Sequence, residues 1–351
     1  MTFDGASSTT FNPPLVSYNW TFGDGSKATG NSTTHTFTEV GTYYTELTVT
    51  DSEGLSDTVS TPVIVTAAGG TNDNPTDNPT DNPTDNPTDN PSASEGSLKL
   101  EVGEVSIDNE WVTVLFDNTF TEPVVVAGPP TNNDSEPVTV RIRNIDQEGF
   151  EVRLEEWDYQ DGPHASETFN YIVIDKGTYT LNNGIKIEAG SFTGTSSSKQ
   201  VSLQQAYDIS PVILSQVITD NEADTVTGRI SNVDQNSFFY KLQEMELTRS
   251  THTTETIGYL AWEPGKGEIS GLLYEAGNTT KSVTHNWYDL NFQTEFADIP
   301  LFIAGMQTYA GSDTVAVRIQ DMSQMAVQVK VEEEQSRDSE VYHTTEVVGY
   351  L

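Results

Sequence analysis

The chain has 351 residues, with 53 Asp and Glu against 16 Lys and Arg, so its formal net charge at pH 7 is −37. The absence of cysteine excludes disulfides, Cys-based zinc sites and thiol nucleophiles. A surface this acidic repels phosphate backbones, and no apolar run approaches about 18 residues, so we expect neither nucleic-acid binding nor membrane insertion.

Residues 1–66 show the pattern of short antiparallel strands. Aromatic and β-branched residues alternate, and Gly-Asp-Gly and Glu-Val-Gly turns interrupt them. The sequences W-T-F-G-D-G at 20–25, H-T-F at 35–37 and G-T-Y at 41–43 occur in that order. Together they resemble the PKD domain, which implies an immunoglobulin-type β-sandwich.

The match to the PKD pattern has two departures. Thr21 stands where the family usually has Asp, and Met1 falls inside the domain. The resemblance therefore implies that the family's first strand is missing, and we expect this chain to be the C-terminal part of something longer.

Residues 67–96 are expected to be a linker. Between Thr71 and Pro91 the sequence T-D-N-P, or a near variant, recurs every four residues. Proline at that spacing forbids helix and central strand, and Asp, Asn and Thr supply no core. We predict a semi-extended spacer without binding chemistry of its own.

Three copies of one module fill the rest of the chain, at 97–180, 181–268 and 269–351. Pro123, Pro211 and Pro300 each precede an apolar run, and an E-x-G tripeptide recurs 87 residues apart at 101, 188 and 275. Alternating apolar and polar residues predict a small antiparallel β-sandwich of about six strands in each copy. The predicted fold class is therefore all-β.

A polar set also recurs in each copy. It consists of an Arg, a Glu 15 residues later, and an H-x-x-E sequence. Its members are Arg141, Glu156, His164 and Glu167; Arg229, Glu244, His252 and Glu255; and Arg318, Glu333, His343 and Glu346.

Two kinds of chemistry fit this set. The His and Glu side chains could bind a metal or form a general acid–base pair. Alternatively, Arg141 pairs with Glu156 or Glu167 on a neighbouring strand, with His164 and Tyr171 bonded around the pair. Active sites seldom occur in three equal tandem copies, so we favour the structural interpretation, keep cation binding as the alternative and expect no catalysis.

The first copy resembles the H-type lectin domain. The similarity lies in P-V-V-V at 123–126, the segment 145–150, Trp157 and Y-I-V-I at 171–174. The resemblance implies a six-stranded β-sandwich that binds galactose-type sugars and assembles as a trimer. By the same resemblance, the three copies would pack as an intramolecular pseudo-trimer.

The resemblance implies a sugar site at Trp157, Asp158 and Tyr159, with the indole stacked on a pyranose ring. The equivalents of Trp157 in the other copies are Met245 and Glu334, and the family's sugar-contacting arginine falls near Pro137. Specificity for galactose is therefore not transferred. The alternative is that Trp157 covers the edge of its sandwich.

Oxygen-rich loops occupy the same place in all three copies, at 132–135, 220–224 and 311–313. Such loops can bind Ca²⁺. They lack ligand spacing of the EF-hand type, so turn chemistry is the alternative. Calcium is the one cofactor that the sequence suggests.

The net negative charge indicates the kind of environment in which the protein works. Acidic residues are scattered along the chain and only nine of the basic residues are lysine. Self-repulsion of this size weakens a compact state unless cations screen it. The pattern is typical of a halophilic surface, and an acidic mesophilic secreted protein is the alternative. Spacers of the T-D-N-P kind separate modules on extracellular proteins, so we expect a location outside the cell or on its surface.

The combined prediction is an extracellular carbohydrate-binding or adhesion module without catalysis. Its expected partner is a surface polysaccharide or the glycan of a glycoprotein. One alternative is the accessory C-terminal part of a larger secreted glycoside hydrolase or protease. The other is a structural stalk or surface-layer component.

Overall fold

The computed structural model describes residues 2–5, 14–38, 41–65, 98–160, 164–247 and 251–351. Every element of regular secondary structure within these ranges is a β-strand, which confirms the all-β prediction. The chain forms two compact units, an N-terminal unit and a larger unit that holds the three repeats. The whole of the predicted linker, 67–96, lies outside the described residues.

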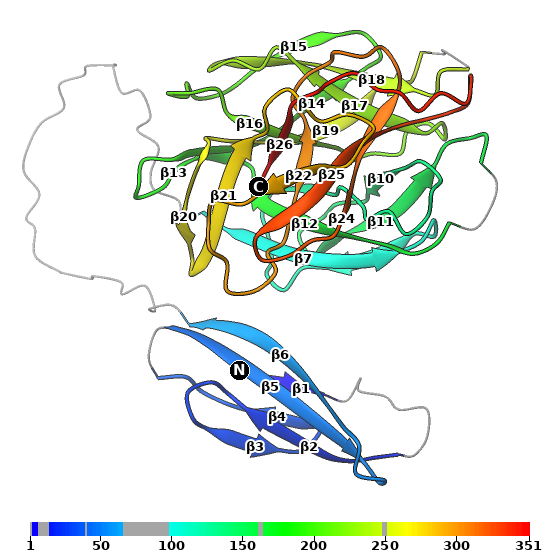
Figure 1. Ribbon diagram of the computed structural model, residues 1–351. Helices are drawn as coiled ribbons and strands as arrows, with labels where there is room; N and C mark the ends of the chain where they lie inside the picture. Colours follow the sequence, from blue (N-terminus) through cyan, green and yellow to red (C-terminus); the bar gives the residue numbers. More distant parts are fainter. Residues whose placement is uncertain (1, 6–13, 39–40, 66–97, 161–163, 248–250) are drawn as a thin grey trace, which may run out of the picture. The chain divides into compact units, whose positions relative to one another are not determined.

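The N-terminal unit has two antiparallel sheets, ordered β3-β2-β5-β6 and β1-β4 (Figure 1). The strands are β1 (Thr2–Asp4), β2 (Leu15–Thr21), β3 (Lys27–Thr29), β4 (Ser32–Thr34), β5 (Gly41–Asp51) and β6 (Ser56–Val65).

The motifs of residues 20–25 and 35–37 build the core of this unit. Trp20, Phe22 and Leu47 are buried together. His35 stacks on Phe22 with ring centroids 4.1 Å apart, and its Nε2 lies 2.7 Å from Oδ2 of Asp24. The G-D-G turn and the H-x-F segment that follows β4 are therefore joined by ring stacking and by a hydrogen bond.

Each repeat of the larger unit has two antiparallel sheets with a hydrophobic core between them. In the first repeat the sheets are β7-β12-β9 and β10-β11-β8. Its strands are β7 (Leu100–Ile107), β8 (Val112–Leu115), β9 (Pro123–Ala127), β10 (Val138–Arg143), β11 (Gly149–Glu156) and β12 (Glu167–Asp175).

The second and third repeats have the sheets β13-β14-β19-β16 with β15-β18-β17, and β20-β21-β26-β23 with β22-β25-β24. The second repeat has β13 (Gly177–Thr180), β14 (Lys186–Gly194), β15 (Lys199–Ser202), β16 (Val212–Val217), β17 (Val226–Ser231), β18 (Ser237–Glu244) and β19 (Glu255–Trp262). The third has β20 (Gly265–Ile269), β21 (Leu272–Asn278), β22 (Tyr288–Asn291), β23 (Ala304–Met306), β24 (Val315–Gln320), β25 (Ala326–Glu333) and β26 (Val348–Tyr350).

The boundaries between the repeats lie a few residues earlier in the structure than in the predicted ranges. Strand β13 lies in the range predicted for the first repeat, yet it pairs with β14 of the second. In the same way β20 lies mostly within the range predicted for the second repeat and joins the sheet of the third. Each of these strands forms a hairpin with the strand that follows it, and a hairpin keeps both strands in one sheet.

The apolar runs after Pro123 and Pro211 are buried on both faces, as continuous hydrophobic strands usually are, whereas the run after Pro300 buries Phe302 and Ile303 but exposes Leu301. Val125 points into the core of its own repeat, whereas Val124 and Val126 point to a second core. That second core is shared by all three repeats. It includes Val124, Val126, Ile172 and Ile174 of the first repeat, Val212, Leu214, Leu260 and Trp262 of the second, and Tyr274, Ala276 and Ile303 of the third.

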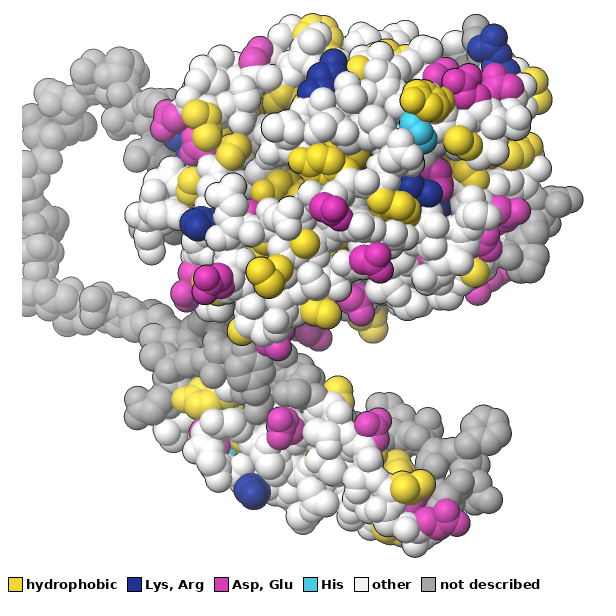
Figure 2. All heavy atoms as spheres, in the orientation of Figure 1, with side chains coloured by type: hydrophobic (Ala, Val, Ile, Leu, Met, Phe, Trp, Pro, Cys, Tyr) yellow, Lys and Arg dark blue, Asp and Glu magenta, His cyan; other side chains and the backbone are white. Residues whose placement is uncertain are grey.

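The surface is acidic, in keeping with the composition. Figure 2 shows Asp and Glu side chains spread over the visible face, with few Lys and Arg side chains among them. No helix in the described ranges is long and apolar enough to cross a membrane.

Candidate functional site

One arginine of each repeat reaches a glutamate of another repeat. The pairs are Arg141–Glu255 (Nη2 to Oε1, 2.8 Å), Arg229–Glu346 (3.2 Å) and Arg318–Glu167 (2.8 Å). All six side chains have 0% exposure. The pairs run from the first repeat to the second, from the second to the third, and from the third to the first, so they form a closed cycle.

The partners differ from the predicted ones in two ways. Arg141 contacts Glu155 of its own sheet, with Nη1 3.2 Å from Oε2, and not Glu156. Successive side chains of a strand point to opposite faces, and residues 141 and 155 share one face of the β10–β11 pair. The second partner is Glu255 of the neighbouring repeat, and not Glu167 of the same repeat.

The tyrosines that close each repeat also lie elsewhere than predicted. Tyr259 donates a hydrogen bond to Glu188 at 2.5 Å, and Tyr350 donates one to Glu275 at 2.9 Å. These glutamates begin the E-x-G tripeptides. In the second and third repeats these hydrogen bonds therefore join two neighbouring strands of one sheet, β14 with β19 and β21 with β26.

The repeated histidines lie between two carboxylates. The hydrogen-bonded pairs in the second and third repeats are His252 Nδ1–Glu244 (3.1 Å), His252 Nε2–Glu255 (3.1 Å), His343 Nδ1–Glu333 (2.7 Å) and His343 Nε2–Glu346 (3.1 Å). Burial disfavours the charged ring, but the hydrogen bond with Glu255 outweighs it and raises the pKa of His252. Each of these two interfaces thus contains a buried Arg–Glu–His–Glu chain.

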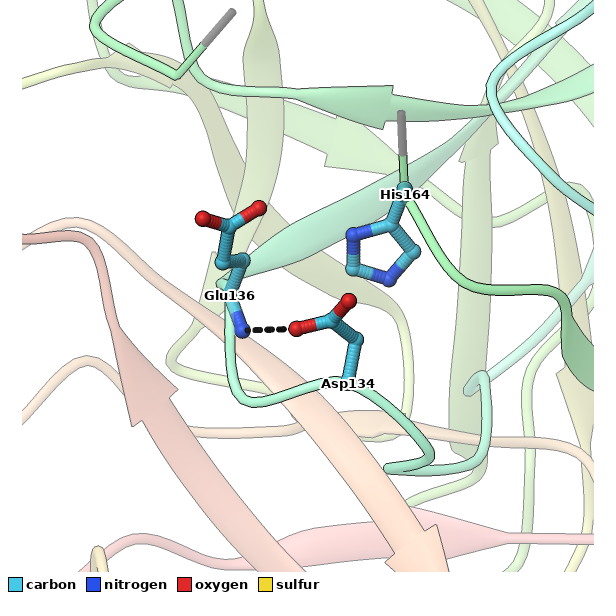
Figure 3. A group of neighbouring side chains, drawn as sticks. All are labelled: Asp134, Glu136 and His164. Carbon is cyan, nitrogen blue, oxygen red and sulfur yellow. Dashed lines mark hydrogen bonds between the residues drawn. The ribbon is translucent and has the colours of Figure 1, made fainter. Parts of the chain in front are cut away.

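Each histidine also has acidic side chains from the oxygen-rich loops beside it. In the first repeat Asp134, Glu136 and His164 converge (Figure 3). The corresponding groups are Glu222, Glu244 and His252, and Asp313, Glu333 and His343; within each group the ligand atoms lie within 4.8 Å of one another. These groups have the donor types that bind a cation.

Trp157 is not placed as a sugar platform. Its side chain is 1% exposed, so no face of the ring is open to a ligand. Asp158 and Tyr159 are exposed, and the Tyr159 hydroxyl accepts a hydrogen bond from the backbone N of Gln335 at 2.9 Å. The burial of the indole therefore prevents the stacking on a sugar ring that was expected of Trp157.

A cavity of about 310 Å³ lies between the second and third repeats. Its lining includes Lys241, Met245 and Glu246 of the second repeat and Tyr309 and Asp313 of the third. Lys241 donates to the Tyr309 hydroxyl at 2.7 Å, and its Nζ lies 4.0 Å from the ring centroid. Tyr309 is 37% exposed, so part of its side chain remains accessible.

Sequence reasoning did not find this cavity. Met245 occupies the position equivalent to Trp157, and its lack of an aromatic ring counted against a site in the second repeat. The ring comes instead from Tyr309, in a loop of the next repeat. Only the packing of two repeats brings these positions together.

The acidic side chains of the cavity interact with one another. Burial raises the pKa of Glu246 to about 7, against a hydrogen bond from the backbone N of Thr314, and the carboxylates of Asp313 and Glu334 add to the rise. The cavity therefore offers an ammonium donor, carboxyl groups and an aromatic ring close together. This set suits a ligand rich in hydroxyl groups.

Comparison with known proteins gives one family match, to the PKD domain, over residues 1–66. Halomucin of Haloquadratum walsbyi is 32% identical over 252 residues, which cover 68% of this chain and 3% of that protein. The match of 252 residues is longer than the segment that precedes residue 97, so this similarity extends into the repeats.

Two further relatives are shorter matches. Microbial collagenase of Vibrio alginolyticus is 43% identical over 75 residues, 21% of this chain and 9% of that protein. Collagenase ColA of Bacillus cereus is 46% identical over 54 residues, 15% of this chain and 6% of that protein. The chain thus spans only a small part of each curated relative.

A solved structure of carbohydrate-binding modules from the β-sandwich superfamily aligns with 75% of this chain and 84% of its own, at 13% identity. Its TM-score is 0.19, too low to support an argument. The H-type lectin interpretation of the repeats stays a prediction. The prediction for the N-terminal unit is confirmed: residues 1–66 are a PKD domain.

Proposed function

We propose that the chain is a carbohydrate-binding and adhesion module without catalysis, displayed outside a halophilic cell. Its ligand would be a surface polysaccharide or the glycan of a glycoprotein. The observation that carries the proposal is the cavity between the second and third repeats. Its volume of about 310 Å³ lies at the lower end of the range of ligand pockets, about 300–1,000 Å³.

The cavity has the chemistry that sugar binding needs. The C–H face of a pyranose packs on an aromatic ring, and charged side chains form strong hydrogen bonds with its hydroxyl groups. Tyr309 offers the ring, and Lys241 and Asp313 offer the charged groups. The ligand contacts of this site would come from two repeats, so the site depends on their packing.

The cycle of buried ion pairs and the shared core support the inference of an intramolecular pseudo-trimer. In such an arrangement each repeat presents the same edge to the next. The proposed ligand site would then be one of three related interfaces, specialised by Tyr309 and Lys241. Linked sites of this kind raise the avidity for a repetitive polymer.

The comparisons support the proposed location. The match to Halomucin of Haloquadratum walsbyi accords with a halophilic origin of the acidic surface. The matches to two collagenases favour a second candidate, in which the chain is the accessory part of a larger secreted enzyme. Burial of Trp157 favours a third, a structural component of the cell surface.

The test is binding of the full chain to immobilised glycans in molar NaCl, with Tyr309→Ala and Lys241→Met as site variants. Tyr342→Ala is the matched control, because Tyr342 is a 71% exposed tyrosine of the third repeat outside the cavity lining. We expect saturable binding that both site variants lose and the control keeps. No binding by the unaltered chain would contradict the proposal and favour the structural component.

A further inference from the structure

His164 differs from its counterparts in the other repeats. Its side chain is buried, at 4% exposure, and neither ring nitrogen has a hydrogen-bond partner among the described residues. Nδ1 lies 3.3 Å from Oε1 of Glu156 and Nε2 lies 3.5 Å from Oε1 of Glu167, without hydrogen-bond geometry. Oε1 of Glu156 is likewise buried and without a hydrogen-bond partner. A buried imidazole in this state requires an explanation, because buried polar groups are nearly always bonded.

Two loop carboxylates converge on this ring. Asp134 and Glu136 precede β10, and their side chains point toward His164 (Figure 3). One ligand atom from each of the three residues lies within 4.8 Å of the others. The backbone N of Asp134 donates to Glu167 at 2.9 Å. The carboxylate of Asp134 accepts hydrogen bonds from the backbone N of Glu136 at 3.2 Å and of Ala165 at 3.4 Å, so the loop is held by both its backbone and this side chain.

We propose that Asp134, Glu136 and His164 form a binding site for a divalent ion of the zinc class, with Glu156 as the fourth ligand. Imidazole nitrogen and carboxylate oxygen are both zinc ligands. Ligands about 2.0–2.1 Å from a tetrahedral zinc ion lie roughly 3.3 Å apart. The separation of 3.3 Å between His164 Nδ1 and Glu156 Oε1 fits that geometry.

The donor set also selects among cations. Calcium takes six to eight oxygen ligands, and a buried imidazole nitrogen is a poor substitute for one of them. Three carboxylates and one neutral imidazole around a divalent ion leave a net charge of about −1, so the site favours a cation of charge +2 over a monovalent one. The site therefore differs from the calcium sites that the oxygen-rich loops suggested.

Binding at this site would strengthen the joint between the first and third repeats. The backbone oxygens of Asp134 and Glu136 accept hydrogen bonds from Arg318 at 3.3 and 3.2 Å. An ion bound to the two side chains would fix the loop that receives this arginine. The ion would thus stabilise the contact that closes the cycle of repeats.

The second and third repeats serve as internal controls. His252 and His343 are hydrogen-bonded through both ring nitrogens, so an ion there must displace existing bonds. We therefore expect one zinc ion per chain, in the first repeat.

The experiment is calorimetric titration of the EDTA-treated full chain with ZnCl₂ in molar NaCl, with CaCl₂ and MgCl₂ as comparison ions. Asp134→Asn and His164→Gln are the site variants, and Glu222→Gln is the matched control in the second repeat. We expect one equivalent of zinc, at least tenfold weaker binding in both site variants and unchanged binding in the control. Zinc should also raise the Tm of the unaltered chain and leave that of Asp134→Asn unchanged.

Asp134→Asn keeps the buried histidine, so it tests the site even where His164→Gln fails to fold. Zinc binding that survives in Asp134→Asn would overturn the proposal, as would the absence of zinc binding in the unaltered chain. Three equivalents, one of them lost in Glu222→Gln, would overturn the assignment to the first repeat alone.

Discussion

Arg318 of the third repeat donates from Nη2 to Oε1 of Glu167 in the first repeat at 2.8 Å, across 151 positions of sequence. Both side chains are fully buried. The desolvation of two such charges is costly, and hydrogen bonds from Arg318 to the backbone oxygen of Thr131 and to Glu332 help to offset it. This pair closes the cycle, because its arginine follows its glutamate in the sequence, whereas in the other two pairs the arginine comes first.

Replacing Arg318 with Gln should lower the free energy of unfolding by about 3–5 kcal/mol, because Glu167 would stay buried without its arginine and Glu332 would keep only Lys330 as a cationic partner. Urea unfolding in molar salt measures the change. Arg337→Gln removes the same charge from an exposed position and serves as the control. Equal stability of the two variants would show that the cycle does not depend on this pair.

The sequence was sufficient to predict the all-β fold and the PKD domain. Alternation of side chains specifies strands, and repetition specifies copies, without knowledge of packing. The sequence of a single repeat does not indicate which residue of another repeat its arginine will contact. The spacing of 15 residues selected Glu156 for Arg141, whereas strand geometry places Glu155 on the same face, and the pairing with Glu255 exists only once the repeats have packed.

The candidate site was predictable only in part. The H-x-x-E sequences did mark buried ionic groups, and the loops beside them did supply carboxylates. Trp157 in its acidic context suggested an exposed ring, yet its side chain is buried in the folded chain. The cavity at Tyr309 has no counterpart in the pattern of any single repeat.

Gly190→Ala should destabilise the second repeat by about 1–3 kcal/mol through overpacking. A Cβ at Gly190 would lie 2.7 Å from the ring of Tyr259, which donates its hydroxyl to Glu188. Thermal unfolding measures the loss. Gly305→Ala is the control, because the nearest atom to a Cβ there is 3.9 Å away. A similar Tm for both variants would show that the packing of Gly190 against the ring of Tyr259 does not require glycine.

The carboxyl group of Glu246 should lower the free energy of unfolding of the chain as the pH rises from about 4.5 to 7. Burial raises its pKa in the folded chain to about 7, above the usual value of 4.5. Between these values the folded state binds more protons than the unfolded state, so raising the pH favours unfolding. Allowing for solvent screening of this partly exposed group, the effect is about 1 kcal/mol.

Urea unfolding of the unaltered chain and of Glu246→Gln, at pH 5 and pH 8, separates this group from the other carboxyl groups. The variant should gain stability relative to the unaltered chain at pH 8 and show little difference at pH 5. A variant that is less stable at pH 8 would show that the ionised carboxylate of Glu246 stabilises the fold.

The net charge of −37 should make folding depend on salt. The Debye length shortens from about 10 Å at 0.1 M salt to about 3 Å at 1 M, which weakens repulsion among exposed carboxylates. Buried pairs such as Arg318–Glu167 are screened much less, so the gain in Tm with NaCl reports on the surface. A triple variant with Glu148→Gln, Glu295→Gln and Glu340→Gln, all at exposed positions, should be more stable than the unaltered chain at 0.1 M NaCl and equal to it at 2 M. The same advantage at both salt concentrations would show that the gain does not come from relief of repulsion.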